Sequence, residues 1–390
     1  MSIPIQTKPR NIILFSVKDN GKGFQGKQTV SWNGKRTSSL LLKSMHWIGL
    51  IEESNCHVIY QVSSFVFKFL LIFVNLSTLV SSIIAFEFEN WKIVGAFVCS
   101  YFFALAVYIS MYRKKKLLTC TLHDINRTYM LNNGTSLNFI TFVLCCLPIV
   151  YSILKGISYD NITLKYEAYG HPVQEPIAQI LLIRSKAFLE ALVHPTFPCL
   201  VALLYCTLCH HCCSLINFLT QHVQQIPPKN FRPSKQMNIL KHKAKIDEIL
   251  SNIQDIFSVP TFFIIITNLL TCGVVIGWLL NLDFSNIRLS DTIESAFHGV
   301  IEFSSLITVP WVASEMSIHL EKLKAAFYDK LRLRLLYTGN LEEPQPKKET
   351  LGKLDFTFTG CDIISFKRST ILALCGTLLT YTILVVNQKD

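Results

Sequence analysis

The chain has 390 residues, of which half are hydrophobic and only 16% are charged. Soluble globular domains carry about 25% charged residues. Their apolar residues also occur in short periodic stretches, whereas the apolar residues of this chain form long unbroken runs. The net charge of +11 does not indicate nucleic-acid binding, because the basic residues lie between the apolar runs and no stacking platform or known module accompanies them. The composition therefore indicates a membrane protein.

The first 45 residues are polar and contain no apolar core of a signal peptide. We expect them to form a cytosolic, partly disordered tail. Most of the thirteen cysteines fall inside apolar runs, where free cysteine behaves as a small hydrophobic residue. A disulfide framework is therefore not expected.

Seven apolar runs are long enough to cross a bilayer, which takes about 20 residues in a helix. They predict an all-α membrane protein with seven transmembrane helices. Pro195 and Pro198 interrupt the start of the fourth run, which can extend to Phe218. In chain order the predicted spans are Val62–Phe86, Trp91–Tyr112, Leu137–Ile157, Phe188–Leu208, Val259–Leu282, Ala296–Met316 and Ser369–Gln388.

The distribution of Lys and Arg predicts the orientation of these spans. With the N-terminus in the cytosol, the inner segments hold about 29 basic residues and the outer segments about 5. The run Arg113–Lys116 directly follows the second span and serves as a topology anchor. Seven spans then place the C-terminus outside the cell, which is opposite to a G-protein-coupled receptor. The third span is also not followed by Asp-Arg-Tyr, and the seventh contains no Asn-Pro-x-x-Tyr.

Two inner segments have the apolar spacing of amphipathic helices. In 238–257, isoleucines and leucines recur at helical spacing between lysines and acidic residues, and Leu320, Leu323, Phe327, Leu331 and Leu335 form a second apolar face. We expect both to continue membrane spans into the cytosol and to pack in an intracellular bundle. The residues 338–350, rich in Glu, Pro and Lys, predict a flexible linker.

The sequence offers no support for an enzyme or for a cofactor. Cys206-Thr-Leu-Cys209-His210 matches the pattern of covalent haem attachment, and Cys213 adds a further metal-type ligand near the same helix face. The motif lies in or beside a membrane helix, so we interpret it as cysteine enrichment in an apolar helix and expect neither metal nor haem. The chain also has no phosphate-binding loop, nucleophile elbow or H-E-x-x-H motif, and no catalytic residue is assigned.

Placing an ionisable side chain inside a membrane span costs free energy, so such residues are candidates for a functional role. Glu302 lies about two turns into the sixth span, with His298 one turn nearer the outer end, and His194 lies at a similar depth in the fourth span. Tyr101, Tyr151 and Trp278 fall in the outer halves of their helices. These six residues predict a small-molecule pocket with aromatic walls and few polar groups. The alternative is that Glu302 and His298 only pair with each other at i, i+4.

The end of the chain carries a set of motifs: Phe356-Thr357-Phe-Thr-Gly360, a helix start at Ser369, Gly376 in mid-helix, and Thr380-Tyr381 followed by a mostly apolar run to Gln388. This combination resembles the C-terminal signature of arthropod gustatory receptors, and the stretch Leu40–Leu50 is similar to their pre-membrane segment. The resemblance covers about the last 35 residues. The sequence departs from the family pattern at Lys389, where the family has Phe, and at Asn387 within the apolar run.

The resemblance implies a ligand-gated, non-selective cation channel of the plasma membrane, a homotetramer or a heteromer with related receptors. Its partners would be a small-molecule tastant, cations and membrane lipid. Each subunit would contribute its last helix to a central pore and would carry its own ligand pocket. The implied parts are a cytosolic tail at 1–45, six membrane helices at 46–316, a cytosolic helix, linker and anchor at 317–368, and the pore helix with the C-terminus at 369–390.

Helical spacing places Thr380, Leu384 and Gln388 on one face of the last helix, with Leu384 as an apolar constriction that gates by dewetting. The orientation predicts glycosylation of Asn161, in an outer loop, and of neither Asn126 nor Asn133. Three alternative functions are not excluded by the sequence: a metabotropic seven-helix receptor, a small-molecule carrier, and a subunit that conducts only with a partner.

Overall fold

The computed structural model describes residues 39–52, 58–85, 91–128, 135–158, 168–169, 171, 175–280, 289–338 and 356–387. Side chains at 84–85, 91–93, 126–128, 338 and 382–387 are outside this description. All described residues belong to one compact unit, Ser38–Asp390.

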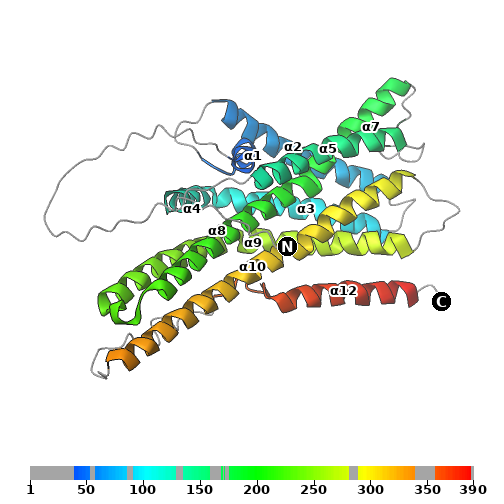
Figure 1. Cartoon of the computed structure of the whole chain (residues 1–390). Coiled ribbons are helices and arrows are strands. Elements are labelled where there is room, and N and C mark those ends of the chain that lie inside the picture. Colours follow the sequence, from blue (N-terminus) through cyan, green and yellow to red (C-terminus); the bar gives the residue numbers. More distant parts are fainter. Residues whose placement is uncertain are drawn as a thin grey trace, which may run out of the picture. The chain divides into compact units, whose positions relative to one another are not determined.

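The described residues are almost entirely helical, which confirms the predicted all-α membrane fold (Figure 1). The long helices run side by side, and two very short strands precede the last helix. The elements are α1 (Leu40–Ile48), α2 (Val58–Ala85), α3 (Trp91–Arg113), α4 (Lys115–Thr128), α5 (Thr135–Ser158), α7 (Pro176–Ala191), the π turn η1 (Leu192–Thr196), α8 (Phe197–Gln225), the 3₁₀ turn η2 (Pro228–Asn230), α9 (Pro233–Leu280), α10 (Leu289–Thr338), β1 (Thr359–Gly360), β2 (Ile364–Ser365) and α12 (Arg368–Asn387).

Within the described residues, six helices are long and apolar enough to cross a membrane. Their stretches at 58–83, 94–113, 135–158, 176–225, 233–280 and 289–337 overlap the first six predicted spans. The predicted first, second and fifth spans extend a few residues beyond these stretches. The seventh predicted span corresponds to α12, a helix of 20 residues whose described side chains end at Tyr381. Apart from the fourth run, which is broken at η1, the apolar runs form continuous helices, because backbone groups in lipid must hydrogen-bond within their own segment.

The helical stretch that holds the fourth predicted span begins before Phe188. Helix α7 begins at Pro176, where proline suits a first helical position because its missing N–H needs no partner there. The helix then breaks at η1, where His194 has extended backbone angles of φ −146° and ψ 123°. A residue before proline is disfavoured in the α region, so Pro195 displaces His194 from the helix, and α8 continues to Gln225.

The segment between the second and third predicted spans contains the helix α4. Leu118, Leu122 and Ile125 recur at i, i+4, i+7 and are buried, so α4 is a short amphipathic helix. The basic residues at its start indicate a charged surface segment in the sequence, and the apolar spacing of the helix is less evident beside them. The two lysines at its start have acidic partners: Nζ of Lys114, just before the helix, lies 2.6 Å from Asp255, and Lys115 Nζ lies 2.6 Å from Glu52.

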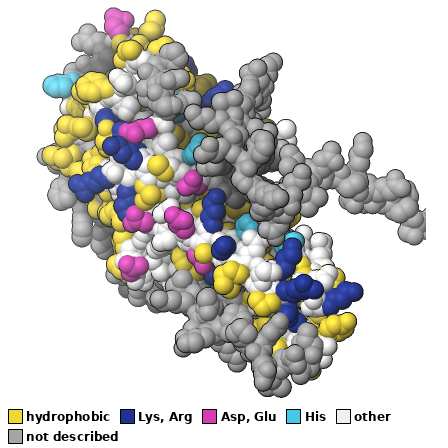
Figure 2. Space-filling model, turned by 90° about the vertical axis from the view of Figure 1, so that its left-hand side faces the viewer, with side chains coloured by type: hydrophobic (Ala, Val, Ile, Leu, Met, Phe, Trp, Pro, Cys, Tyr) yellow, Lys and Arg dark blue, Asp and Glu magenta, His cyan; other side chains and the backbone are white. Residues whose placement is uncertain are grey.

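Both predicted amphipathic segments continue membrane spans without a break, in α9 with 48 residues and α10 with 50 residues. The ends of α8, α9 and α10 extend together past the other helices (Figure 1). Phe231, next to η2, meets Phe327 of α10 edge-on with 5.2 Å between ring centroids. Figure 2, which views the molecule from this side, shows basic and acidic side chains intermixed with apolar ones, as expected for a helical bundle in water.

The segment before α12 is a tight hairpin. Thr359 pairs with Ser365 and Gly360 with Ile364, and the Ile363 N–H donates to the Gly360 carbonyl oxygen at 3.0 Å. Cys361 and Asp362, at the centre of this turn, both have positive φ, at 51° and 56°, as in the turns that suit the twist of hairpin strands. Three residues separate the paired Gly360 and Ile364.

The hairpin docks on the bundle through buried rings. Phe358 and Phe366 are both at most 1% exposed and contact Tyr205 of α8 at centroid distances of 5.6 and 6.5 Å. Gln254 of α9 accepts from the Thr359 N–H at 3.0 Å and donates to its hydroxyl at 2.6 Å. The start of α12 is therefore held by contacts to α8 and α9.

Candidate functional site

A buried histidine–glutamate cluster lies where η1 meets α10. His298 and Glu302 are one turn apart on α10 and so share a face, with His298 Nδ1 3.9 Å from Glu302 Oε1. His194 comes from the helix break at η1, and its Nε2 lies 3.1 Å from the same oxygen. The three side chains belong to residues that are 1%, 4% and 1% exposed in the order His194, His298 and Glu302.

Aromatic rings form the walls of this cluster. The two imidazoles stack with 5.5 Å between centroids, Tyr101 of α3 meets His194 edge-on at 5.4 Å, and Tyr151 of α5 lies 6.4 Å from His298. Tyr151 also stacks on Phe297 at 4.4 Å. Rings from three helices and η1 therefore surround a small polar centre.

Asn268, a polar residue from a neighbouring helix, positions the Glu302 carboxylate. With its amide nitrogen directed toward the available acceptors, Asn268 of α9 donates to Glu302 Oε2 and to the Ile264 carbonyl oxygen at 3.1 Å. Its amide oxygen then accepts from Ser305 Oγ at 2.9 Å. Glu302 is thus held from α9 on one oxygen, while Oε1 faces the two imidazoles.

Five of the six residues predicted for a ligand pocket meet in this cluster: Tyr101, Tyr151, His194, His298 and Glu302. Trp278 is half-buried on α9, and among the described residues no ring contact or ion pair joins it to the others. The alternative in which Glu302 pairs only with His298 does not describe the geometry, because His194 approaches Glu302 more closely.

Two polar features near this region were not predicted from the sequence. Asn268 gave no signal, because a lone amide in an apolar run looks like any tolerated polar residue. Lys155 at the end of α5 forms an ion pair with Glu294 near the start of α10. Lys155 and Glu294 both lie near the outer ends of predicted spans, so their opposite charges could have predicted this pair from the sequence.

The cysteine-rich part of α8 does not form a ligand cluster with His210. Cys209, Cys212 and Cys213 are buried, whereas His210 is exposed. In the described part of the chain, the group with metal-ligand spacing is instead His194, His298 and Glu302, whose ligand atoms lie within 4.8 Å of one another.

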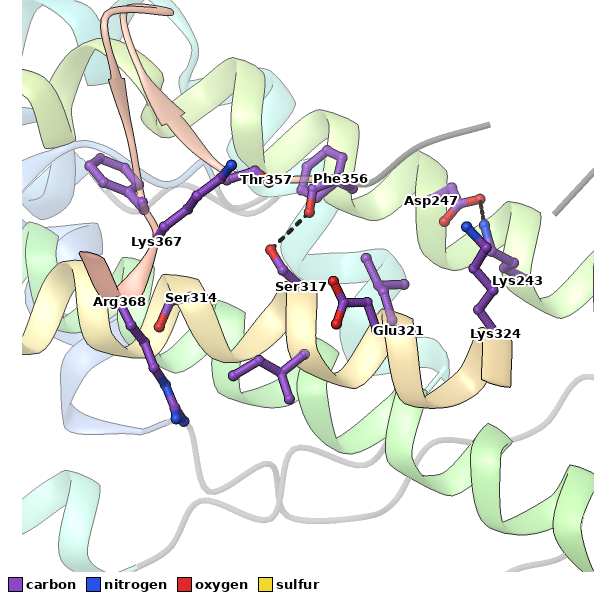
Figure 3. Close-up of a pocket in the computed structure, with 13 residues that line it drawn as sticks. Lys243, Asp247, Ser314, Ser317, Glu321, Lys324, Phe356, Thr357, Lys367 and Arg368 are labelled. Atoms are coloured by element: carbon purple, nitrogen blue, oxygen red, sulfur yellow. Dashed lines mark hydrogen bonds and ion pairs between the residues drawn. The ribbon is translucent and has the colours of Figure 1, made fainter. Parts of the chain in front are cut away.

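A cavity of about 380 Å³ lies farther along α10, beside residues 314–324 and against the hairpin segment (Figure 3). The Lys243 ammonium pairs with Asp247 at 2.6 Å on one side of it, and Ser317 Oγ donates to the Phe356 carbonyl oxygen at 3.0 Å. Arg368, the first residue of α12, lies over the Trp311 ring at 5.1 Å. This cavity joins α9, α10 and the start of α12.

No protein-family model matches the sequence, and no curated protein sequence matches it. The structure, however, is similar to that of the insect olfactory receptor OR5 from Machilis hrabei, with a TM-score of 0.63 over 88% of this chain and 96% of that receptor, at 13% identity. This chain has the fold of an insect olfactory receptor. The structure of the same receptor in complex with eugenol matches with a TM-score of 0.60 and 14% identity, over 89% of this chain and 95% of the receptor.

Within this fold the C-terminal motif residues divide between the hairpin and α12. Phe356, Thr357 and Gly360 lie in and before the hairpin, while Gly376 and Tyr381 lie on α12. The predicted pore residue Thr380 is exposed on α12, and Leu384 falls within the same helix. Gln388, Lys389 and the glycosylation candidate Asn161 lie outside the described residues.

Proposed function

We propose that this protein is a chemosensory receptor of the gustatory type that acts as a ligand-gated, non-selective cation channel. The observation that carries the proposal is the similarity to an insect olfactory receptor, which extends over nearly the whole of both chains. The C-terminal signature at 356–388, read from the sequence, supports the same assignment independently. The protein would be a multi-pass protein of the plasma membrane, with the N-terminus in the cytosol and the C-terminus outside.

The packing of α12 supports its role as the pore helix. Its inner stripe, Ile371, Leu374 and Leu378, recurs at i, i+3, i+7 and is wholly or partly buried. The ring of Tyr381 adds to this side by approaching Gly273 and Gly277 of α9. Helix α12 therefore packs on its own subunit along one narrow stripe.

The opposite face of α12 carries Ser369, Ala373, Gly376 and Thr380, at i, i+4, i+7 and i+11, and all four are exposed. Small and hydroxyl side chains at helical spacing suit close approach by other copies and a water-filled path. Thr380 thus faces away from its own bundle. We therefore assign this face to a central pore in a homotetramer or heteromer, with Leu384 as the apolar gate and Gln388 as the outer polar ring.

The buried cluster would form the polar centre of a ligand site in the outer half of each subunit. Glu302, His298 and His194 supply the polar groups, and Tyr101 and Tyr151 supply aromatic walls, which is the usual composition of a small-molecule site. Trp278 is proposed as a more distant wall residue on α9. A tastant bound there would act on α10, which runs from this cluster to the hairpin that anchors α12.

The first test is expression in a heterologous cell with current recording against a panel of sugars, bitter compounds and carbon dioxide. We expect a ligand-evoked cation current that survives G-protein inhibition. A response that requires a G protein would instead identify a metabotropic receptor, and uptake of labelled ligand without current would identify a carrier. A current that appears only with a related receptor would identify an obligate partner subunit.

The second test uses cysteine substitution on α12 with thiol reagents added from outside. Thr380→Cys is expected to give channel block, whereas the matched control Leu378→Cys, on the packed stripe of the same helix, is not. Block at Thr382 and Val386 in place of 380 and 384 would rotate the helix by nearly half a turn and contradict the assignment.

The third test addresses the ligand site. Glu302→Ala is expected to shift ligand potency while surface expression stays within about twofold, whereas Glu248→Ala, which removes an exposed carboxylate from α9, leaves potency unchanged. An unaltered dose–response in Glu302→Ala with normal trafficking would remove Glu302 from the site.

A further inference from the structure

The histidine–glutamate cluster contains polar atoms that the described residues leave without hydrogen bonds. These are His194 Nδ1 and Nε2, His298 Nδ1 and Glu302 Oε1. His194 Nε2 and Glu302 Oε1 are within hydrogen-bonding distance at 3.1 Å, yet their orientation makes no hydrogen bond. Buried polar groups are nearly always paired. One such atom from each of the three residues lies within 4.8 Å of the others, which indicates an additional binding partner.

The spacing of these atoms suits a metal ion. One ligand atom from each residue lies within 4.8 Å of the others, and the two measured separations from Glu302 Oε1 are 3.1 and 3.9 Å. Ligand atoms around a tetrahedral zinc ion, with bonds of 2.0–2.2 Å, lie about 3.4 Å apart. Small side-chain movements would therefore bring all three atoms to bonding distance.

We propose that His194, His298 and Glu302 bind one divalent transition-metal ion of the Zn²⁺ class. Two imidazoles and one carboxylate are a typical zinc ligand set that leaves a fourth position open. Ca²⁺ and Mg²⁺ prefer oxygen ligands throughout, and imidazole favours zinc, copper or nickel. Both residues on α10 reach the ion from one helix face, and His194 closes the site from η1.

Asn268 supports the site as an outer partner. It holds Glu302 Oε2, which leaves Oε1 for the ion, and Ser305 in turn fixes the Asn268 amide. Hydrogen bonds of this kind orient ligand carboxylates and change metal affinity by about 10- to 100-fold. The separation of the ligands between two elements means that a bound ion would fix the helix break at His194 against α10.

The site shares residues with the proposed tastant site but does not depend on the protein being a channel. A site without metal is the competing explanation, in which a protonated His194 pairs directly with Glu302. Metal binding to the purified protein distinguishes the two without any measurement of current.

The test is titration of the purified, chelator-treated full-length protein with Co²⁺, followed by visible absorption, and then displacement by Zn²⁺. We expect about one equivalent of low-coordinate cobalt with nitrogen and oxygen ligands, which Zn²⁺ removes. Glu302→Gln and His298→Gln are expected to abolish the signal, and Asn268→Ala to weaken binding at least about tenfold. His210→Gln, which changes an exposed histidine on α8, serves as the matched control and keeps full binding.

Folding is checked on the same samples by gel filtration and thermal unfolding, where Zn²⁺ should raise the Tm of the native protein and of His210→Gln but not of Glu302→Gln. Absence of a cobalt signal in the folded native protein would overturn the proposal. A signal with thiolate charge-transfer bands that persists in Glu302→Gln would also overturn it, by placing the ion on the cysteines of α8. Either result leaves the channel proposal intact, since that is decided by current recording.

Discussion

Gly360 tests whether the hairpin is a rigid support for α12. A methyl group at position 360 would lie 3.3 Å from both Cα and Cβ of Phe262 on α9 and 3.3 Å from Cζ of Phe366. These contacts are too close for a relaxed structure, and the Phe262 backbone lies inside a long helix that cannot move locally. Overpacking of this kind costs about 1–3 kcal/mol. We therefore expect Gly360→Ala to loosen the hairpin and lower the Tm of the solubilised protein by a few degrees.

Gly95→Ala on α3 is the matched control, because a methyl group at position 95 meets nothing within 4 Å and the residue lies outside the proposed pore face. Alanine is favoured over glycine inside a helix by about 1 kcal/mol, so this variant should keep or raise the Tm. Fluorescence-detected thermal unfolding in detergent provides the measurement, and ligand-evoked current provides a second one. If Gly360→Ala has the stability of the native protein, or if Gly95→Ala is equally destabilised, the argument that the hairpin is tightly docked is refuted.

Three further outcomes are expected. Removing Asn161 by substitution with Gln should abolish any glycosidase-sensitive mobility shift, and a shift that persists would contradict the proposed topology. Cys361→Val should destabilise the protein by about 1–2 kcal/mol, because a β-branched residue is unfavourable at a φ of 51°, whereas Cys361→Asn should not, and equal Tm values would refute this. A hydrogen bond from Lys115 lowers the pKa of Glu52 from 4.5, despite an opposing effect of burial. The pair therefore stabilises the protein above about pH 4.5 and loses this effect as the pH falls through the folded-state pKa. With 41% of the Glu52 side chain exposed, the contribution is about 0.5 kcal/mol or less, and Glu52→Gln should flatten the dependence of Tm on pH in acid.

The division of the chain into membrane helices was determined by the sequence alone. A helix that crosses lipid must satisfy its backbone internally and present apolar side chains along its whole length, so run length in the sequence is sufficient to locate it. The continuation of α9 and α10 past the apolar runs was also predictable, because Ile246, Ile249 and Ile253 keep helical spacing. The cost of a carboxylate in lipid likewise predicted that Glu302 is buried inside the bundle.

Tertiary structure decided which of these residues meet. His194 reaches Glu302 only because Pro195 breaks the helix and displaces the residue before it, and the distance between two residues on different helices has no periodic signal in the sequence. Asn268 acquires its role from the same packing. The sequence also does not predict which face of α12 is buried, because helical spacing only groups residues into faces. Contacts with α9 and α10 show that Leu378 lies inward and Thr380 outward.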